Sequence, residues 1–167
     1  MPADTRMPAF TPREFRDAMG QFATGVVVVS TVVDGATHAM TANAFMSGSL
    51  EPPLALVSIA RSARMHGRIE AAGGFGVSIL GQRQRWCSDH FAGKPSPEQA
   101  PVFEPLNGMP VVEGANVQLT ATLRHAYACG DHTLYVGEVG ALRARPESPP
   151  LLFHGGRYAR LAEPVTP

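Results

Sequence analysis

Apolar segments separated by short turn signals run along most of the chain. Residues 26–33 (VVVVSTVV) are almost wholly β-branched and too short for a stable helix, so they predict a buried strand. Asp34-Gly35 predicts a hairpin turn that returns the chain along a second strand. The strands expected in this half of the chain are residues 26–33, 38–44, 54–60 and 75–80.

In the second half of the chain the pattern changes. Residues 117–124 alternate apolar and polar side chains, which is typical of a half-buried strand. Residues 130–132 (GDH) predict a turn, and residues 133–143 continue the sheet. Residues 151–153 predict a last short strand before a tight polar turn at residues 154–158. Strands joined by short turns, with a few helices outside, predict an antiparallel barrel or sandwich.

A capping-box pattern predicts the first helix. Thr11 precedes a proline at the first helical position and Glu14 at the third. An apolar stripe at helical spacing continues to about residue 23, and Gly25 ends the helix. The stripe consists of Phe15, Ala18, Met19 and Phe22. We expect this stripe to pack into the core.

Two further helices and a long loop complete the expected elements. Ser62 is a candidate N-cap for a helix of about ten residues that ends at Gly73. Residues 84–91 predict a short helix that carries the only tryptophan. Residues 93–110 contain five prolines and two glycines and therefore predict an extended loop, of a length that often forms a lid or a subunit contact. The inner face of the helix after Ser62 would consist of Met65, Ile69 and Ala72.

Length and composition limit the kinds of protein that this chain can be. The 167 residues suit one domain, placed at residues 11–162 between a flexible lead at residues 1–10 and a tail at residues 163–167. The net charge is zero, which argues against a nucleic-acid or membrane-surface protein that acts by electrostatics. No apolar run approaches the length of about 18 residues that a membrane span needs, and no secretory signal is evident. We therefore expect a cytoplasmic protein.

Familiar catalytic and metal-binding patterns are absent from the sequence. Cys87 and Cys129 have no CxxC spacing, so we expect free thiols, buried and inert, with a catalytic thiol as the less favoured alternative. The histidines lack zinc-site spacing, and there is no GxSxG elbow, P-loop or strand–GxGxxG–helix unit. Carboxylates are sparse and scattered, which argues against a two-carboxylate hydrolase.

Residues 37–60 concentrate small polar side chains, with Thr41, Asn43, Ser47 and Ser49 close together. These would supply neutral donors to a ligand with phosphate and carbonyl oxygens, although the same residue types favour ordinary turns, so a plain surface loop is the alternative. A site made of backbone, hydroxyls, amides and arginines suits an enzyme whose chemistry belongs to a bound cofactor. Hydride transfer between two planar rings is such a reaction.

Several segments of the chain resemble, in order, the flavin reductase-like, FMN-binding split-barrel family. The resemblance extends from Phe15 to about Leu161, nearly the whole chain. The segments are FR and FATGV within residues 15–26, TANAF and SGSLEPPL within residues 41–54, FAG at residues 91–93, GDH and VGEV within residues 130–139, and GRY at residues 156–158.

The resemblance implies a mainly β fold, a six-stranded antiparallel split barrel of Greek-key topology with a few peripheral helices. It also implies a homodimer that holds FMN or FAD near the subunit interface and uses NADH or NADPH as hydride donor, with no metal. A hydride would pass from C4 of the nicotinamide to N5 of the flavin, without a protein acid or base. A separate monooxygenase would receive the reduced flavin.

The resemblance also implies which residues form the site. Residues 41–44 and Ser47 would touch the flavin ring and its phosphate arm, and residues 58–60 would line the ring and ribityl chain. Arg64 would begin the next helix and contact phosphate, and residues 91–92 would close over the flavin. His132, the implied catalytic residue, would orient the nicotinamide nucleotide. The implied cofactor contacts are Thr41, Ala42, Asn43, Ala44, Ser47, Ser58, Ile59, Ala60, Arg64, Met65, Phe91, Ala92, Arg157 and Tyr158.

Plain structural roles are the alternatives at these positions: a turn for Asn43 or His132, solvation for Arg64, and packing for Tyr158. Two residues depart from the family pattern. Gly48 replaces a common valine, which we expect to loosen the loop, and Met46 replaces a small polar residue. Both leave the choice of flavin and the tightness of binding open.

Two alternatives to a reductase remain at this point. The same fold could hold flavin for electron transfer or storage without reductase turnover. A pyridoxamine-phosphate oxidase relative is less favoured, because the GDH and GRY segments match the reductase branch.

Overall fold

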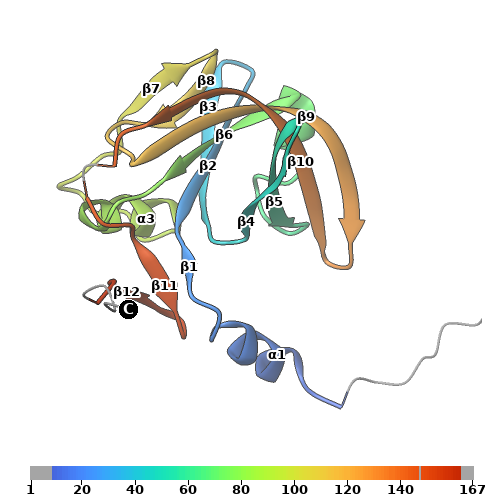
Figure 1. Ribbon diagram of the computed structural model, residues 1–167, viewed down its shortest axis with the longest axis vertical. Coiled ribbons are helices and arrows are strands. Elements are labelled where there is room, and N and C mark those ends of the chain that lie inside the picture. Colours follow the sequence, from blue (N-terminus) through green and yellow to red (C-terminus); the bar gives the residue numbers. More distant parts are fainter. Residues whose placement is uncertain (1–8, 147, 163–167) are drawn as a thin grey trace, which may run out of the picture.

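A curved, seven-stranded antiparallel sheet organises the molecule (Figure 1). The computed structural model describes residues 9–146 and 148–162, so the expected tail and most of the expected lead lie outside the described residues. The strand order in the sheet is β3-β2-β6-β9-β10-β5-β4. Its strands are β2 (Val27–Val33), β3 (Ala36–Ala42), β4 (Phe45–Leu50), β5 (Pro53–Ala60), β6 (Gly74–Ile79), β9 (Val117–Cys129) and β10 (His132–Ala144).

Strand β4 accounts for the difference from the six strands expected. The polar segment after β3, expected as a loop, pairs antiparallel with β5, and a register shift between Ser47 and Ser49 leaves Gly48 in a bulge. A Cβ atom on Gly48 would overlap the side chain of Leu56. The expectation that this glycine loosens a loop is therefore wrong, because it lets the edge strand lie close against β5.

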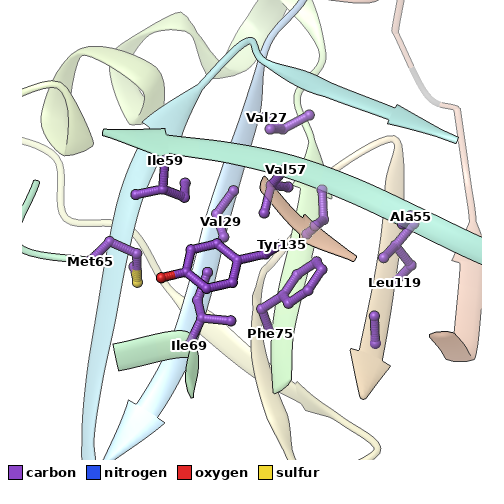
Figure 2. Close-up of a cluster of buried hydrophobic side chains, with 12 residues drawn as sticks. Val27, Val29, Ala55, Val57, Ile59, Met65, Ile69, Phe75, Leu119 and Tyr135 are labelled. Carbon is purple, nitrogen blue, oxygen red and sulfur yellow. The ribbon is translucent and has the colours of Figure 1, made fainter. Parts of the chain in front are cut away.

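The main core lies against the concave side of this sheet. Residues of β2, β5, β6, β9 and β10 meet there, and Figure 2 shows Tyr135 and Phe75 at the centre of the cluster. The run expected to be buried, residues 26–33, is indeed buried over most of its length: Val27 and Val29 enter this core, while Val26 and Val28 enter a second cluster. Burial on both faces explains why β2 does not alternate apolar and polar residues.

Helix α1 (Pro12–Met19) has the predicted capping box but not the predicted burial. The Thr11 hydroxyl accepts a hydrogen bond from the Glu14 backbone N–H, and the Glu14 carboxylate accepts one from Thr11. None of the helix is buried: Phe15 is 53% exposed and Met19 56%, and beyond the helix Phe22 is 78% exposed. The helix ends at Gly20 rather than at Gly25, which lies in β1 (Thr24–Gly25). Figure 1 shows α1 apart from the large sheet.

The second expected helix is much shorter than predicted. Turns occupy residues 61–67, and α2 spans only Arg68–Ala72. Gly67, with a φ of 80°, precedes the helix, so Ser62 is not its N-cap. Ile69 is buried in the core as expected. Arg64 lies in the turns and not at a helix N-terminus, which removes the geometry expected for a phosphate site.

The segment expected as an extended loop contains a hairpin, β7 (Phe103–Leu106) and β8 (Met109–Val112). Its turn is Asn107-Gly108, where both residues have positive φ. The hairpin packs on the large sheet, where Val111 and Val112 are buried and Ser78 Oγ accepts a 2.8 Å hydrogen bond from the Val112 N–H. Within the expected loop, the stretch before the hairpin, residues 93–102, has no helix or strand.

A small sheet at the end of the described chain joins β1 to β11 (Leu152–His154) and β12 (Arg157–Ala159). Arg157 and Tyr158 therefore lie in a strand, not in the polar turn expected there. A short 3-10 helix (Gln82–Gln84) leads into α3 (Arg85–Phe91), as predicted.

Both cysteines are free, but only Cys87 is buried, so the expected burial of Cys129 is wrong. Among the described residues, no helix has the length and apolar character to cross a membrane.

Candidate functional site

The residues expected to cradle a cofactor lie where β3, β4 and β5 meet. Thr41 and Ala42 end β3, Asn43 and Ala44 connect it to β4, and Ser47 lies on β4. The Ser58 N–H donates a 3.0 Å hydrogen bond to the Ala44 carbonyl, which ties this connection to β5. The structure thus brings the first two expected segments, residues 41–47 and 58–60, side by side.

The side chains of these segments differ in what they offer a ligand. Asn43 and Ser47 are exposed, and their side chains make no hydrogen bond to another described residue. The Thr41 hydroxyl instead donates a 2.6 Å hydrogen bond to the Ser88 carbonyl of α3. The Ile59 and Met65 side chains are buried in the main core (Figure 2), so their side chains cannot line a ligand site and only their backbone atoms can.

His132 begins β10 directly opposite Ala60. Its Nδ1 lies 2.7 Å from Asp131 Oδ1, and this hydrogen bond is the first cause that lowers the pKa of the Asp131 carboxyl, followed by the histidine charge. Because Asp131 is ionised at neutral pH, His132 Nδ1–H is the donor. The imidazole, 42% exposed, is oriented by this bond and keeps Nε2 available.

Helix α3 connects the cradle to the C-terminal hairpin. The Tyr158 hydroxyl lies 2.8 Å from Ser88 Oγ and donates a 3.0 Å hydrogen bond to Asp89 Oδ1. The Arg85 guanidinium lies over the Tyr158 ring, 4.9 Å from its centroid. Burial, the largest cause, raises the pKa of Tyr158. Phe91, at the end of the helix, packs against Phe103.

Ser88, Asp89 and Arg85 contact expected site residues, although the sequence alone did not point to them. The spacing of Arg85 and Asp89 is that of an i,i+4 ion pair, and their N and O atoms lie 3.6 Å apart. The i,i+4 spacing of Arg85 and Asp89 in the sequence could therefore have indicated this ion pair. Their partner Tyr158 lies about 70 residues farther along the chain, so no local pattern connects it with them.

Other residues expected at the site do not take part in the contacts around Tyr158 and α3. Arg64, Ala92 and Arg157 are exposed, and none makes a side-chain hydrogen bond or ion pair with another described residue. Two cavities among the described residues have volumes of about 60 and 220 Å³, and no expected site residue lines either of these two. Nor does any group of three His, Cys, Asp or Glu side chains within residues 9–146 and 148–162 suit a metal ion.

Comparison with known proteins identifies relatives over nearly the whole chain. The family described as flavin reductase like domain matches residues 19–162. An NADH-dependent flavin reductase from Rhodococcus sp is 42% identical over 157 residues, which are 92% of this chain and 89% of that protein. The reductase component of 4-hydroxyphenylacetate 3-monooxygenase from Thermus thermophilus is 38% identical over 90% of this chain and 97% of its own.

A solved structure has the same architecture. The flavin reductase PheA2 in its native state superposes with a TM-score of 0.88 at 45% sequence identity, and the match covers 92% of this chain and all of that one.

Proposed function

The chain belongs to the flavin reductase-like domain family, and we propose that the surface where β3, β4 and β5 meet is where it reduces a flavin. The protein is an NADH-dependent flavin reductase, an oxidoreductase that supplies reduced flavin to a monooxygenase. The observation that supports this function most strongly is the 42% identity to an NADH-dependent flavin reductase over 92% of the chain.

The donors of this surface suit FMN or FAD. Asn43 and Ser47 present an amide and a hydroxyl that are exposed and not engaged by described residues. A flavin carries carbonyl and phosphate oxygens, which accept hydrogen bonds from neutral donors of this kind. The flavin, when bound, supplies the ring that accepts the hydride. The part left to the protein is to hold and align the two nucleotides.

We assign the orientation of the nicotinamide nucleotide to His132. Its Nδ1–H donates to the exposed Asp131, which favours one ring orientation and leaves Nε2 for a hydrogen bond to a ligand. Its position opposite Ala60 supports this role, because Ala60 ends the strand that carries Ser58. Arg64 and Arg157 are exposed cations in turns and in β12, and we keep both as phosphate contacts on the basis of charge alone.

We further propose that the curved sheet is a split barrel of Greek-key topology. Strands β3 and β4 follow each other in the chain, yet they form the two edges of the sheet. A barrel that opens between them would have this order, and its opening would place the Asn43-Ala44 connection at the split.

A homodimer is the assembly that this surface favours. The apolar face of α1, formed by Phe15 and Met19 and continued by Phe22, is exposed in the single chain. Removal of such an apolar face from water favours association with another surface. A second copy could also add walls to the proposed site. A single domain at residues 11–162 and a cytoplasmic location remain predictions, with which the two free cysteines agree.

Replacement of Asn43 by alanine tests the placement of the flavin. Loss of one hydrogen bond should raise the KM for flavin about five- to tenfold and leave the KM for NADH within about twofold. Steady-state NADH consumption, measured with FMN and with FAD, provides both constants, and a parallel series with NADPH identifies the preferred donor. An unchanged KM for flavin would remove Asn43 from the site.

A further inference from the structure

The Tyr158 hydroxyl joins two residues of α3 to the C-terminal hairpin. A phenol carries one proton, and that proton is donated to Asp89 Oδ1 at 3.0 Å. Ser88 Oγ, at 2.8 Å from the same hydroxyl, is therefore the donor to Tyr158. Both hydrogen-bonding roles of the Tyr158 hydroxyl are filled within the chain, which leaves it little capacity to bind a nucleotide directly.

The same serine holds the flavin cradle. The carbonyl of Ser88 accepts the 2.6 Å hydrogen bond from Thr41, at the end of β3 and two residues before Asn43. Ser88 is fully buried, so neither of its bonds competes with water. Ser88 thus links the two ends of this arrangement: its backbone carbonyl holds Thr41, and its hydroxyl holds Tyr158, which in turn bonds Asp89.

We propose that Tyr158 is a positioning residue, whose hydroxyl holds α3 against the end of β3 and so keeps the flavin cradle in its binding-competent arrangement. This role replaces the expected cofactor contact of Tyr158, and it rests on the proposed site at β3, β4 and β5.

The surroundings of the ring favour a fixed hydroxyl. Tyr158 packs edge-on against Phe153, with ring centroids 5.8 Å apart, and Arg85 covers the ring. Burial raises the pKa of Tyr158, so the hydroxyl keeps its proton, and its bond to Asp89, through neutral and mildly alkaline pH. A phenylalanine at this position would keep the packing and remove only the two hydrogen bonds.

The effect of Tyr158→Phe on flavin affinity depends on the fraction of molecules whose flavin cradle is in the binding-competent arrangement. The apparent dissociation constant is the intrinsic constant divided by the competent fraction. Loss of the two bonds lowers that fraction, and we expect the flavin Kd and the KM for flavin to rise about three- to tenfold. At saturating flavin the arrangement is restored, so kcat and the KM for NADH should stay within about twofold.

The test compares Tyr158→Phe with Tyr135→Phe, a matched control. The Tyr135 hydroxyl also donates a 3.0 Å hydrogen bond to a carboxylate, that of Glu70, but it lies at α2. Flavin Kd by fluorescence titration, kcat, both KM values and the melting temperature are measured for each protein. We expect both variants to lose thermal stability and only Tyr158→Phe to lose flavin affinity.

A Ser88→Ala variant, alone and combined with Tyr158→Phe, completes the experiment. If Ser88 and Tyr158 act through their shared hydrogen bond, the double variant raises the flavin Kd by less than the product of the fold-changes in the two single variants. An unchanged flavin Kd in Tyr158→Phe, or a rise in the KM for NADH instead, would overturn the inference. Absence of flavin-dependent NADH consumption in the wild-type protein would instead overturn the proposed function.

Discussion

His132 combines exposure with a fixed orientation, and its replacement by alanine separates hydride transfer from flavin binding. The variant should lose at least about tenfold in NADH-dependent turnover, because misalignment of the nucleotide is costly, while the flavin Kd stays within about twofold. Turnover and flavin titration measure the two effects. Asp131→Asn, which keeps the histidine but weakens its tether, should show a smaller loss. Equal losses of turnover and flavin affinity in His132→Ala would contradict this division of roles.

The two cysteines should differ sharply in reactivity. Burial raises the pKa of the Cys87 thiol to about 12, so it carries almost no thiolate at pH 8, whereas Cys129 is exposed. An alkylating reagent should therefore modify one thiol in the folded protein and two after denaturation. Peptide mass spectrometry identifies the site, and rapid labelling of Cys87 in the native state would show that α3 is not packed as described.

At the scale of single residues, the sequence predicted which side chains are polar donors better than it predicted what each side chain contacts. The exposed donors Asn43 and Ser47 were identified because polar side chains in a short segment are visible without a structure. Thr41, Ile59 and Met65 were assigned to the cofactor as well, but their side chains point to α3 or to the core. The direction of a side chain depends on strand register and on partners far along the chain, which no local pattern contains.

At the scale of elements, Gly48 determines how β4 lies on β5. Replacement by valine, the residue expected from the family pattern, would overlap Leu56 Cδ1, the end of a half-buried side chain that must rotate away, and should destabilise the protein by about 0.5–1.5 kcal/mol. Thermal unfolding measures this change. Met46→Val, on the exposed side of the same strand, is the control and should change stability by less than about 0.5 kcal/mol. Equal stability of Gly48→Val and wild type would contradict the packing of β4.

Elements with strong periodic signals were predicted, and elements set by tertiary pairing were not. The β-branched run of β2 and the Asp34-Gly35 turn were both found. The hairpin β7–β8 was missed although its Asn-Gly turn was visible, since its prolines dominated the pattern. Strand β4 has no strand pattern of its own, because a bulged edge strand of small polar residues forms only through its partner β5.

At the scale of the whole molecule, the mainly antiparallel β architecture was predicted and the place of α1 was not. An amphipathic stripe shows that a helix face needs cover, but it does not show whether that cover comes from the same chain. In this structure α1 lies apart from the large sheet, with its apolar face exposed (Figure 1).

Changes in the exposed apolar face of α1 test the proposed homodimer. The double variant Phe15→Ser/Phe22→Ser should shift the protein from dimer to monomer in sedimentation velocity, because it removes the largest apolar side chains of the face. The same variant should bind flavin more weakly if the second copy walls the site. Val102→Ser changes an exposed apolar residue of the segment before β7 and should remain dimeric. A monomeric wild-type protein would contradict the proposed assembly.

The central claim, that this chain reduces flavin with NADH, is tested most directly by anaerobic mixing of the flavin-loaded protein with NADH. Flavin absorbance followed in time reports hydride transfer without a partner oxygenase. We expect the flavin to bleach to its reduced form in the presence of the protein, far faster than in a protein-free mixture. Flavin that binds but stays oxidised on the time scale of the protein-free mixture would contradict this claim.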